Sequence, residues 1–289
     1  MNNYKEYLVL LSKTYEEAVE FLLQKYGPAQ DDYFRENSYQ RFMNGEIKNI
    51  TKGKASRTNE GLYCHHIDEI KWLKISDQGF VKRFNIPFEF QRKDRLVYCD
   101  LAEHTILHVL IIKETSFEFG YPGYEVFLKR LIEEWYLDKI IPNPEWMKNC
   151  YNRSFLEPNK ALNLLKEMQR MLGKNYFNTL LDYYEARNKL EEERIKRQQE
   201  LKQARINERE GWVERAKQLH NKSPRSAVVV ASYYICIEYK NPTYILNRES
   251  ITFKEYDSKM KKYTKEKILE ELLVYIERLP ELAGEESNK

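Results

Sequence analysis

The amino-acid sequence predicts an α+β fold, in which a mainly helical chain contains one small unit of two strands and a helix. Three observations support this prediction. Between about 118 and 182, apolar residues recur at the i, i+3 and i+4 spacing of core-forming helices. Two short runs at 61–67 and 95–99 are rich in Leu, Val and Tyr, as strands are. A long charged helix is expected over 183–222, where opposite charges recur at i, i+4 spacing and apolar residues are sparse.

The composition is that of a globular protein. Among 289 residues, 48 basic and 45 acidic side chains give a net charge of +3, too little to indicate a polyanion partner by itself. The four cysteines form no CxxC pair, so neither a zinc ribbon nor a disulfide framework is indicated, and reduced thiols are expected. No signal peptide and no apolar run of about 18 residues is found, so we expect a cytoplasmic protein without a membrane segment.

Changes along the chain predict five segments. Capping residues mark helix starts at Thr14, with Glu17, and at Ser223. For the charged stretch we prefer a solvated connecting helix over a dimeric coiled coil, because its apolar positions keep no heptad. The segments are an N-terminal helical segment (1–57), a histidine-containing unit of two strands and a helix (58–118), a helical domain (119–182), the charged connecting helix (183–222) and a C-terminal helical domain that could bind a DNA target or a partner (223–289).

Four of the five histidines fall within the second segment. His104 and His108 are four residues apart, so a helix places both imidazoles on one face, as one metal ion requires. Asp100 and Glu103 fit a capping box, which predicts that this helix begins at Leu101 and that Glu103 is a cap rather than a ligand. The positive potential of such a first turn favours a phosphate nearby.

The adjacent pair in "GLYCHHI", His65 and His66, raises a separate question. Neighbouring side chains on a regular strand point to opposite faces, so both imidazoles can reach one ion only if the strand ends or bulges there. Two different roles are therefore expected for them.

The stretches "CHHIDE" and "EHTILH" resemble the HNH endonucleases, whose ββα-metal (His-Me) finger carries a histidine pair on its first strand and a metal-binding histidine on its helix. The resemblance covers about 58–112 and implies a metal-dependent endonuclease that hydrolyses phosphodiester bonds of DNA. It implies that His65 and His104 are metal ligands and that His66 is the general base. His108 would be a further ligand or a phosphate contact. The implied cofactor is one divalent ion, with Mg²⁺ or Mn²⁺ preferred and Zn²⁺ left open.

Three features depart from the family's pattern. Arg95 stands where the family has an asparagine that pins the loop at the catalytic site, so Arg95 or its neighbour Asp94 is expected to take over that task. The loop from 67 to 94 is longer than in compact members and contains apolar anchors such as Trp72 and Phe90. The paired CxxC knuckles of many members are absent, so packing must hold the finger together.

Basic residues close to the histidines are candidate phosphate contacts. We expect Lys52, Lys54, Arg57, Arg92 and Lys93 to bind the DNA backbone, although a merely solvated loop is the alternative for the first three. One finger cuts one strand, so cleavage of a duplex would need a homodimer or two binding events. Restriction, phage defence and mobile elements are the expected contexts.

A different class of function would use the same histidines. Four imidazoles could supply the four ligands of a closed structural zinc site, and the chain would then be a non-catalytic DNA-binding or regulatory protein. The second member of the adjacent pair argues against this, because a structural site has no need of a base. Beyond about 118 no other cluster of ligand residues appears, so that part is expected to set the target and to contribute no catalytic group.

Overall fold

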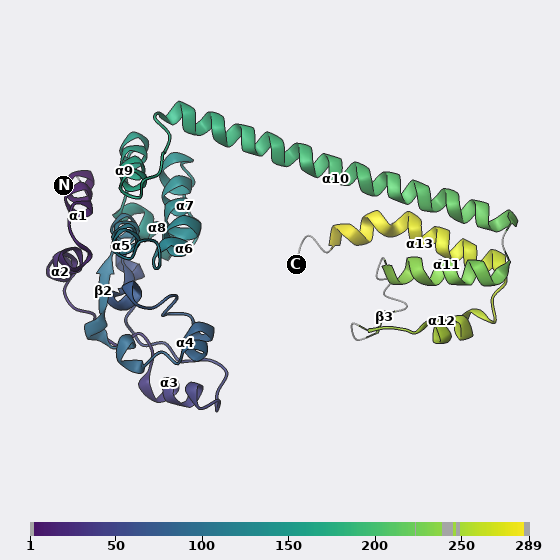
Figure 1. The fold of residues 1–289 in the computed structure, drawn as a ribbon, viewed down its shortest axis with the longest axis horizontal. Coiled ribbons are helices and arrows are strands. Elements are labelled where there is room, and N and C mark those ends of the chain that lie inside the picture. Colours follow the sequence, from purple (N-terminus) through teal and green to yellow (C-terminus); the bar gives the residue numbers. More distant parts are fainter. Residues whose placement is uncertain (1–2, 223, 239–244, 247–248, 286–289) are drawn as a thin grey trace. The chain divides into compact units, whose positions relative to one another are not determined.

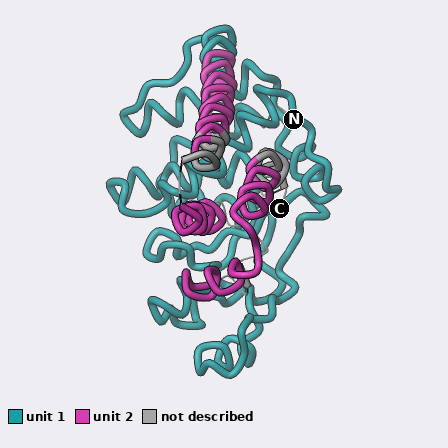
Figure 2. The backbone as a smooth tube through the Cα atoms, turned by 90° about the vertical axis from the view of Figure 1, so that its right-hand side faces the viewer, with its two compact units in different colours: residues 1–187 teal, residues 188–289 magenta. Residues whose placement is uncertain are grey.

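The computed structural model describes residues 3–222, 224–238, 245–246 and 249–285. The chain forms two compact units (Figure 1), unit 1 with residues 1–187 and unit 2 with residues 188–289, which Figure 2 colours teal and magenta. The first three predicted segments thus lie together in unit 1, and the charged helix crosses the boundary between the units. The prediction of a mainly helical α+β chain is confirmed.

Unit 1 consists of helices around one two-stranded sheet. Its α-helices are α1 (Asn3–Leu11), α2 (Tyr15–Tyr26), α3 (Glu36–Met43), α4 (Gln78–Phe84), α5 (Leu101–Glu114), α6 (Tyr121–Gly123), α7 (Lys129–Ile132), α8 (Glu145–Arg153) and α9 (Pro158–Met171). Its strands are β1 (Tyr63–His66) and β2 (Leu96–Cys99). The tighter 3-10 turns are η1 (Thr58–Glu60), η2 (Ile67–Ile70), η3 (Phe88–Gln91) and η4 (Lys93–Arg95), and the wider π-helical turns are η5 (Tyr124–Leu128) and η6 (Glu133–Leu137).

Helix α5 forms the centre of the unit 1 core. Eleven of its fourteen residues are buried, and such a helix, apolar on nearly all sides, is stable only inside a protein. Helices α1, α2 and α9, the turn η5 and the sheet all contact it (Figure 1). The side chains of α5 are therefore held in fixed positions from several directions.

The predicted order of strand, loop, strand and helix is confirmed. Strands β1 and β2 pair antiparallel, with Tyr63 opposite Cys99 and His66 opposite Leu96. Strand β1 ends at His66, where the turn η2 begins, and β2 is separated from α5 by Asp100 alone. The sheet thus delivers the histidine pair to the side of α5.

The long loop between the two strands has a core of its own. Phe34 and Tyr39 from the segment around α3 pack with Ile75 and Val81 from the loop, and all four side chains are buried. The apolar anchors that the sequence places in this loop therefore hold it against α3. Helix α4 starts within it, capped by Asp77, whose carboxylate accepts from the Phe80 amide.

The other sequence-predicted helices are also present. The capping box of Thr14 and Glu17 starts α2, and the stretch from 121 to 137 is helical but interrupted by the two π-helical turns. The charged helix α10 (Leu180–Lys222) is 43 residues long. Every helix in the described part of the chain is too short or too polar to span a bilayer.

Unit 2 has a small core formed by α11 (Arg225–Glu238), α12 (Phe253–Met260) and α13 (Lys265–Glu285). Strands β3 (Ile245–Leu246) and β4 (Glu249–Ser250) add a short antiparallel pair that the sequence did not predict. The helix expected after Ser223 is present as α11, although the proposed cap itself lies outside the described residues.

Candidate metal centre

Three imidazoles from β1 and α5 converge on one point. One nitrogen from each of His65, His104 and His108 lies within 4.8 Å of the others, and the ring centroids are 5.1 to 5.5 Å apart. The i, i+4 spacing places the two α5 histidines on one face, and the end of β1 brings the third to that face. This is a donor arrangement that one metal ion could occupy.

Tyr15 determines which nitrogen His65 can offer. The Tyr15 hydroxyl donates to the Ile67 carbonyl oxygen at 2.8 Å, so its oxygen is left to accept from His65 Nε2 at 2.9 Å. His65 therefore carries its proton on Nε2 and presents the lone pair of Nδ1. That Nδ1 is buried and has no hydrogen-bond partner among the described residues.

His108 is oriented by residues beyond α5. Its Nδ1 donates to the Gly120 carbonyl oxygen at 3.0 Å, which leaves the Nε2 lone pair for a ligand. Gly123 lies against the ring, and a side chain would not fit there because a Cβ would lie 2.6 Å from Cε1 of His108. The region beyond 118 thus supplies no reacting group to the cluster but does position one of its imidazoles.

His104 completes the cluster with a second unpaired nitrogen. Its ring lies between Tyr63 and the other two imidazoles, and its Nδ1 is buried without a partner in the described part of the chain. Leaving a buried nitrogen unpaired costs about 1–3 kcal/mol, so two unpaired nitrogens among three converging imidazoles favour a ligand. The cluster therefore fits a metal ion, and the residues that would hold it are the three histidines predicted as ligands from the sequence.

His66 points away from this cluster and has different partners. Gln91 donates through Nε2 to the Ile75 carbonyl oxygen at 3.0 Å, so its Oε1 faces His66 Nε2 at 3.1 Å and accepts from it. The Tyr33 ring packs edge-on against the imidazole at 4.4 Å between centroids. His66 thus keeps its proton on Nε2 and has a free lone pair on Nδ1. The expected difference between the two members of the pair is present in their surroundings.

Glu69 is a site residue that the sequence analysis missed. Its Oε2 lies 3.2 Å from His108 Nε2 and 3.9 Å from His65 Nδ1, and its Oε1 lies 3.9 Å from His66 Nδ1. The turn η2 follows β1 at once and folds Glu69 back between the paired imidazoles. The signal was present in "HHIDE", because a glutamate three and four residues after two histidines reaches them when a helical turn follows.

Burial and the Glu69 charge set the pKa values of the centre. Burial lowers the pKa of His65 to about 3 and also lowers the pKa of His66 and His104. Burial acts on His108 in the same direction, but the hydrogen bond and charge of Glu69 outweigh it, so that pKa is raised. The pKa of Glu69 is lowered although burial opposes this, because the surrounding imidazoles favour the carboxylate.

Arg95 lies beside the centre and secures η2. Its guanidinium binds the Asp68 carboxylate through two nitrogens, with Nε to Oδ2 at 2.6 Å, and Asp68 is 1% exposed. Asp68 is the residue before Glu69, so this bidentate pair fixes the turn that carries the carboxylate. These contacts match the pinning task expected at this position.

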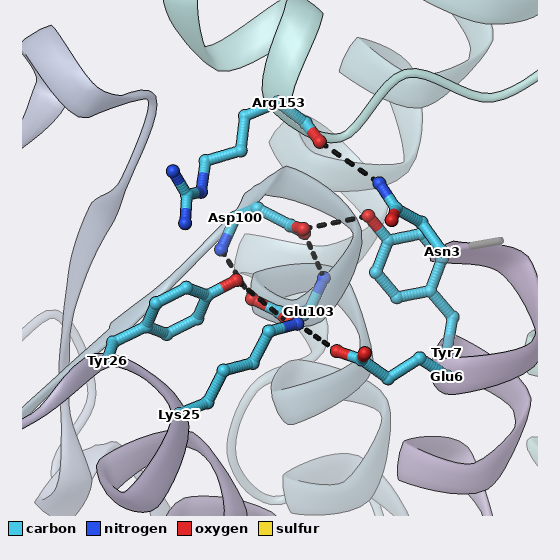
Figure 3. A network of polar contacts seen from close by, with 8 residues as sticks. All are labelled: Asn3, Glu6, Tyr7, Lys25, Tyr26, Asp100, Glu103 and Arg153. Atoms are coloured by element: carbon cyan, nitrogen blue, oxygen red, sulfur yellow. Dashed lines mark hydrogen bonds and ion pairs between the residues drawn. The ribbon is translucent and has the colours of Figure 1, made fainter. Parts of the chain in front are cut away.

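The start of α5 is enclosed by a polar network (Figure 3). Asp100 and Glu103 form the predicted capping box, and both are buried. Tyr7 donates to Asp100 at 2.7 Å, while Lys25 and Tyr26 donate to Glu103 at 2.7 and 3.1 Å. Burial, and next the charge of Glu103, raise the pKa of Asp100 to about 7.

This network corrects one expectation and confirms another. The first turn of α5 is filled by its own carboxylates and covered by α1 and α2, so it does not face a phosphate. Glu103 is a cap, as predicted. The network instead fixes the start of α5, and with it the direction in which His104 points, one residue later.

The basic residues fall into two groups. Arg57 is half-buried, forms a two-nitrogen ion pair with Glu60 and stacks on Tyr98, so its charge is already used within the fold. Lys52, Lys54, Arg92 and Lys93 are exposed. They come together because the backbone amides of Lys54 and Lys93 donate to the neighbouring carboxylates of Asp31 and Asp32.

Those exposed basic loops lie next to His66. The Tyr33 amide donates to the Gln91 carbonyl oxygen, and the Gly53 amide donates to the Tyr33 carbonyl oxygen. Gln91 and Tyr33 both contact the His66 ring. The structure therefore brings two basic loops, 52–54 and 92–93, to the side of the centre that His66 faces.

Comparisons of the chain with protein-family models, with curated proteins and with solved structures give no match.

Proposed function

We propose that this protein is a metal-dependent endonuclease of HNH type that hydrolyses phosphodiester bonds, with His66 as the general base. One observation carries the proposal: an imidazole with a free Nδ1 stands beside three converging imidazoles without belonging to them. A site that only held a structural ion would have no use for it. The order of strand, strand and helix agrees with the HNH resemblance.

The neighbours of His66 suit it to this task. Gln91 holds the Nε2 proton, so Nδ1 is the basic atom, and burial keeps the imidazole neutral near pH 7 by lowering its pKa. A proton taken from water by Nδ1 would lie 3.9 Å from Glu69 Oε1, whose negative charge stabilises the resulting imidazolium. A divalent ion bound by the three histidines would stabilise negative charge on the phosphate and the leaving oxygen.

The substrate we propose is DNA, held by the exposed basic loops. Lys52 and Lys54 on one loop and Arg92 and Lys93 on the other carry four positive charges next to the base, and phosphate contacts of this kind position a duplex without reading its sequence. Arg57 is a weaker candidate than the other four because Glu60 neutralises it. Cutting both strands would require a homodimer or two binding events.

A second function, a non-catalytic DNA-binding or regulatory protein with a structural zinc site, is favoured by Glu69. Three imidazoles and one carboxylate can supply the four ligands of a closed zinc site, which has no open position for substrate. Against it stands the Gln91 bond to His66, which orients an imidazole that such a site would not need.

A plasmid-nicking assay separates the two functions. The metal-free protein is supplied in turn with Mg²⁺, Mn²⁺ and Zn²⁺, and supercoiled DNA is followed as it becomes nicked or linear. Nicking that requires a metal and disappears in His66→Ala supports the endonuclease. Tight zinc binding without nicking under any metal supports the structural site. Sequencing the cut ends would then distinguish a defined target from general degradation.

A further inference from the structure

We propose that Glu69 is the fourth ligand of the ion held by His65, His104 and His108, and that this donor set takes a first-row transition-metal ion in preference to Mg²⁺. The inference rests on the metal centre of the proposed function but not on its chemistry, and an ion that takes five or six ligands would keep positions open for a phosphate and water. It assigns a ligand and an ion class that the three histidines alone leave open.

The position of the carboxylate is the first argument. Glu69 Oε2 lies 3.2 Å from His108 Nε2 and 3.9 Å from His65 Nδ1. In each ring the other nitrogen carries the proton, which is donated to Gly120 by His108 and to Tyr15 by His65. Both lone pairs therefore point toward the same carboxylate oxygen. The two lone pairs and the carboxylate oxygen are all acceptors, so a cation or a proton between them is needed to satisfy them.

Asp68 and Glu69 are adjacent acids with different partners. Asp68 is matched by Arg95 and lies 3.6 Å from Lys71, whereas within the described residues no Lys or Arg lies within 4.0 Å of Glu69. The Glu69 side chain is only 20% exposed. The carboxylate is mostly removed from water and faces imidazoles rather than Lys or Arg, so a cation bound between them would pair with its charge.

Donor chemistry decides the class of ion. Mg²⁺ prefers an octahedron of oxygens and gives up its waters reluctantly, so three imidazoles suit it poorly. Imidazole nitrogens with one carboxylate suit ions between Mn²⁺ and Zn²⁺ in the first transition row. This revises the sequence-based preference for Mg²⁺ or Mn²⁺ to a preference for Mn²⁺, Co²⁺ or Zn²⁺.

The test measures ion binding directly. The full-length chain is stripped with a chelator and titrated with Co²⁺, by calorimetry and by the visible absorption of the bound ion, in wild type, Glu69→Gln and Glu89→Gln. Glu89 is an exposed glutamate of the same loop and serves as the matched control.

We expect Glu69→Gln to bind Co²⁺ about 10- to 100-fold more weakly, with a changed visible spectrum, while Glu89→Gln matches wild type. We also expect an excess of Mg²⁺ to leave Co²⁺ binding to the wild type unchanged. Thermal unfolding of the metal-free variants checks that each is folded. An unaltered affinity and spectrum in folded Glu69→Gln would overturn the ligand assignment, and displacement of Co²⁺ by Mg²⁺ would overturn the ion class.

The same samples keep this inference separate from the proposed function. If the wild type nicks no DNA with any ion but Glu69→Gln still loses Co²⁺, then Glu69 is a ligand and the endonuclease proposal fails. If the wild type nicks DNA and Glu69→Gln binds Co²⁺ as wild type does, the endonuclease stands and Glu69 is not a ligand.

Discussion

The two compact units bury different kinds of side chain. In unit 2, the buried polar side chain among the described residues is Ser232, whose hydroxyl hydrogen-bonds with that of Tyr256. Unit 1 buries imidazoles and carboxyl groups, namely those of His65, His66, His108, Asp68, Asp100 and Glu103. Unit 2 therefore resembles a core built for folding, whereas unit 1 contains groups that folding alone does not require.

The free-energy cost of burying ionisable groups explains why the difference between the units matters. A buried ionisable group is tolerated when it is paired, and Asp68, Asp100 and Glu103 all have hydrogen-bonded partners. His65 and His104 each keep a buried nitrogen without one. Tyr63, beside His104, and Glu125 also keep one buried oxygen without a partner among the described residues. Two of these four unpaired atoms lie in the imidazole cluster, where a ligand is the simplest way to satisfy them. Four predictions follow this contrast between the units.

The largest effect is expected for the base in unit 1. His66→Ala should lower the nicking rate by about 10²- to 10⁴-fold, roughly 3 to 5 kcal/mol of barrier, and should retain ion binding because His66 is not one of the converging ligands. His104→Ala should instead weaken ion binding, with activity partly recovered at higher metal concentration. His220→Ala, in unit 2, is the control and should leave both unchanged. Nicking rates against metal concentration are the measurement, and equal loss of ion binding in His66→Ala and His104→Ala would contradict the division of roles.

Two glycine-to-alanine changes should have opposite consequences in the two units. Gly123→Ala places a methyl group against the His108 ring, so we expect about 10- to 100-fold weaker ion binding. Gly211, in the part of α10 that belongs to unit 2, has no atom within 4 Å of an added Cβ. Gly211→Ala should stabilise that helix by up to about 1 kcal/mol and leave ion binding unchanged. Calorimetric titration and thermal unfolding give both readings. Wild-type ion binding in Gly123→Ala would show that the glycine does not position His108.

Acid should weaken unit 1 in the metal-free protein. His65, His66 and His104 have lowered pKa values in the fold, so below about pH 6.5 the unfolded chain takes up protons that the folded chain does not, and stability falls with pH. His108, with its raised pKa, and Asp100, with a pKa of about 7, act in the opposite direction. Because three groups lower the stability on acidification and two raise it, we expect the free energy of unfolding of unit 1 to fall by about 1–2 kcal/mol between pH 7.5 and 5.5.

Tryptophan fluorescence can confine that measurement to unit 1. In Trp212→Phe the three remaining tryptophans, at 72, 135 and 146, all lie in unit 1. Denaturant titrations at the two pH values then give the free energy of unfolding of that unit. Asp100→Asn keeps a good helix cap but removes one opposing group, so its loss on acidification should be steeper. Equal stability at both pH values in the two proteins would contradict the assigned protonation states.

The smallest effect on the centre is expected when unit 2 is removed. A chain ending at residue 187 keeps the unit 1 residues that contact the imidazole cluster, including Gly120 and Gly123, so its Co²⁺ affinity should stay within about a factor of two of the full chain. DNA affinity or target preference should change if unit 2 sets the target. Binding titrations with Co²⁺ and with DNA on both chains are required. Loss of Co²⁺ binding in the folded shorter chain would show that the centre depends on unit 2.

Sequence patterns alone predict the local parts of the centre. The i, i+4 spacing of His104 and His108, the capping box at Asp100 and the two short strands were all predicted and are all present. These features depend on residues at most four apart, or on the composition of one short run, and such short-range periodicities can be read along a chain. The different surroundings of His65 and His66 were also predicted, from the alternation of side chains on a strand.

Which nitrogen atoms of those histidines are free depends on contacts that are distant in the sequence. Tyr15, Gln91 and Gly120 fix the three ring protons from 50, 25 and 12 residues away. Glu69 is close in sequence, but it reaches the imidazoles because Arg95, 27 residues from Asp68, secures the turn. Such contacts arise from how buried surfaces pack, which no local spacing encodes. The residue types of the centre can therefore be read from the sequence. The protonation and the orientation of its imidazoles depend on packing around α5, because hydrogen-bond partners are set by proximity in space.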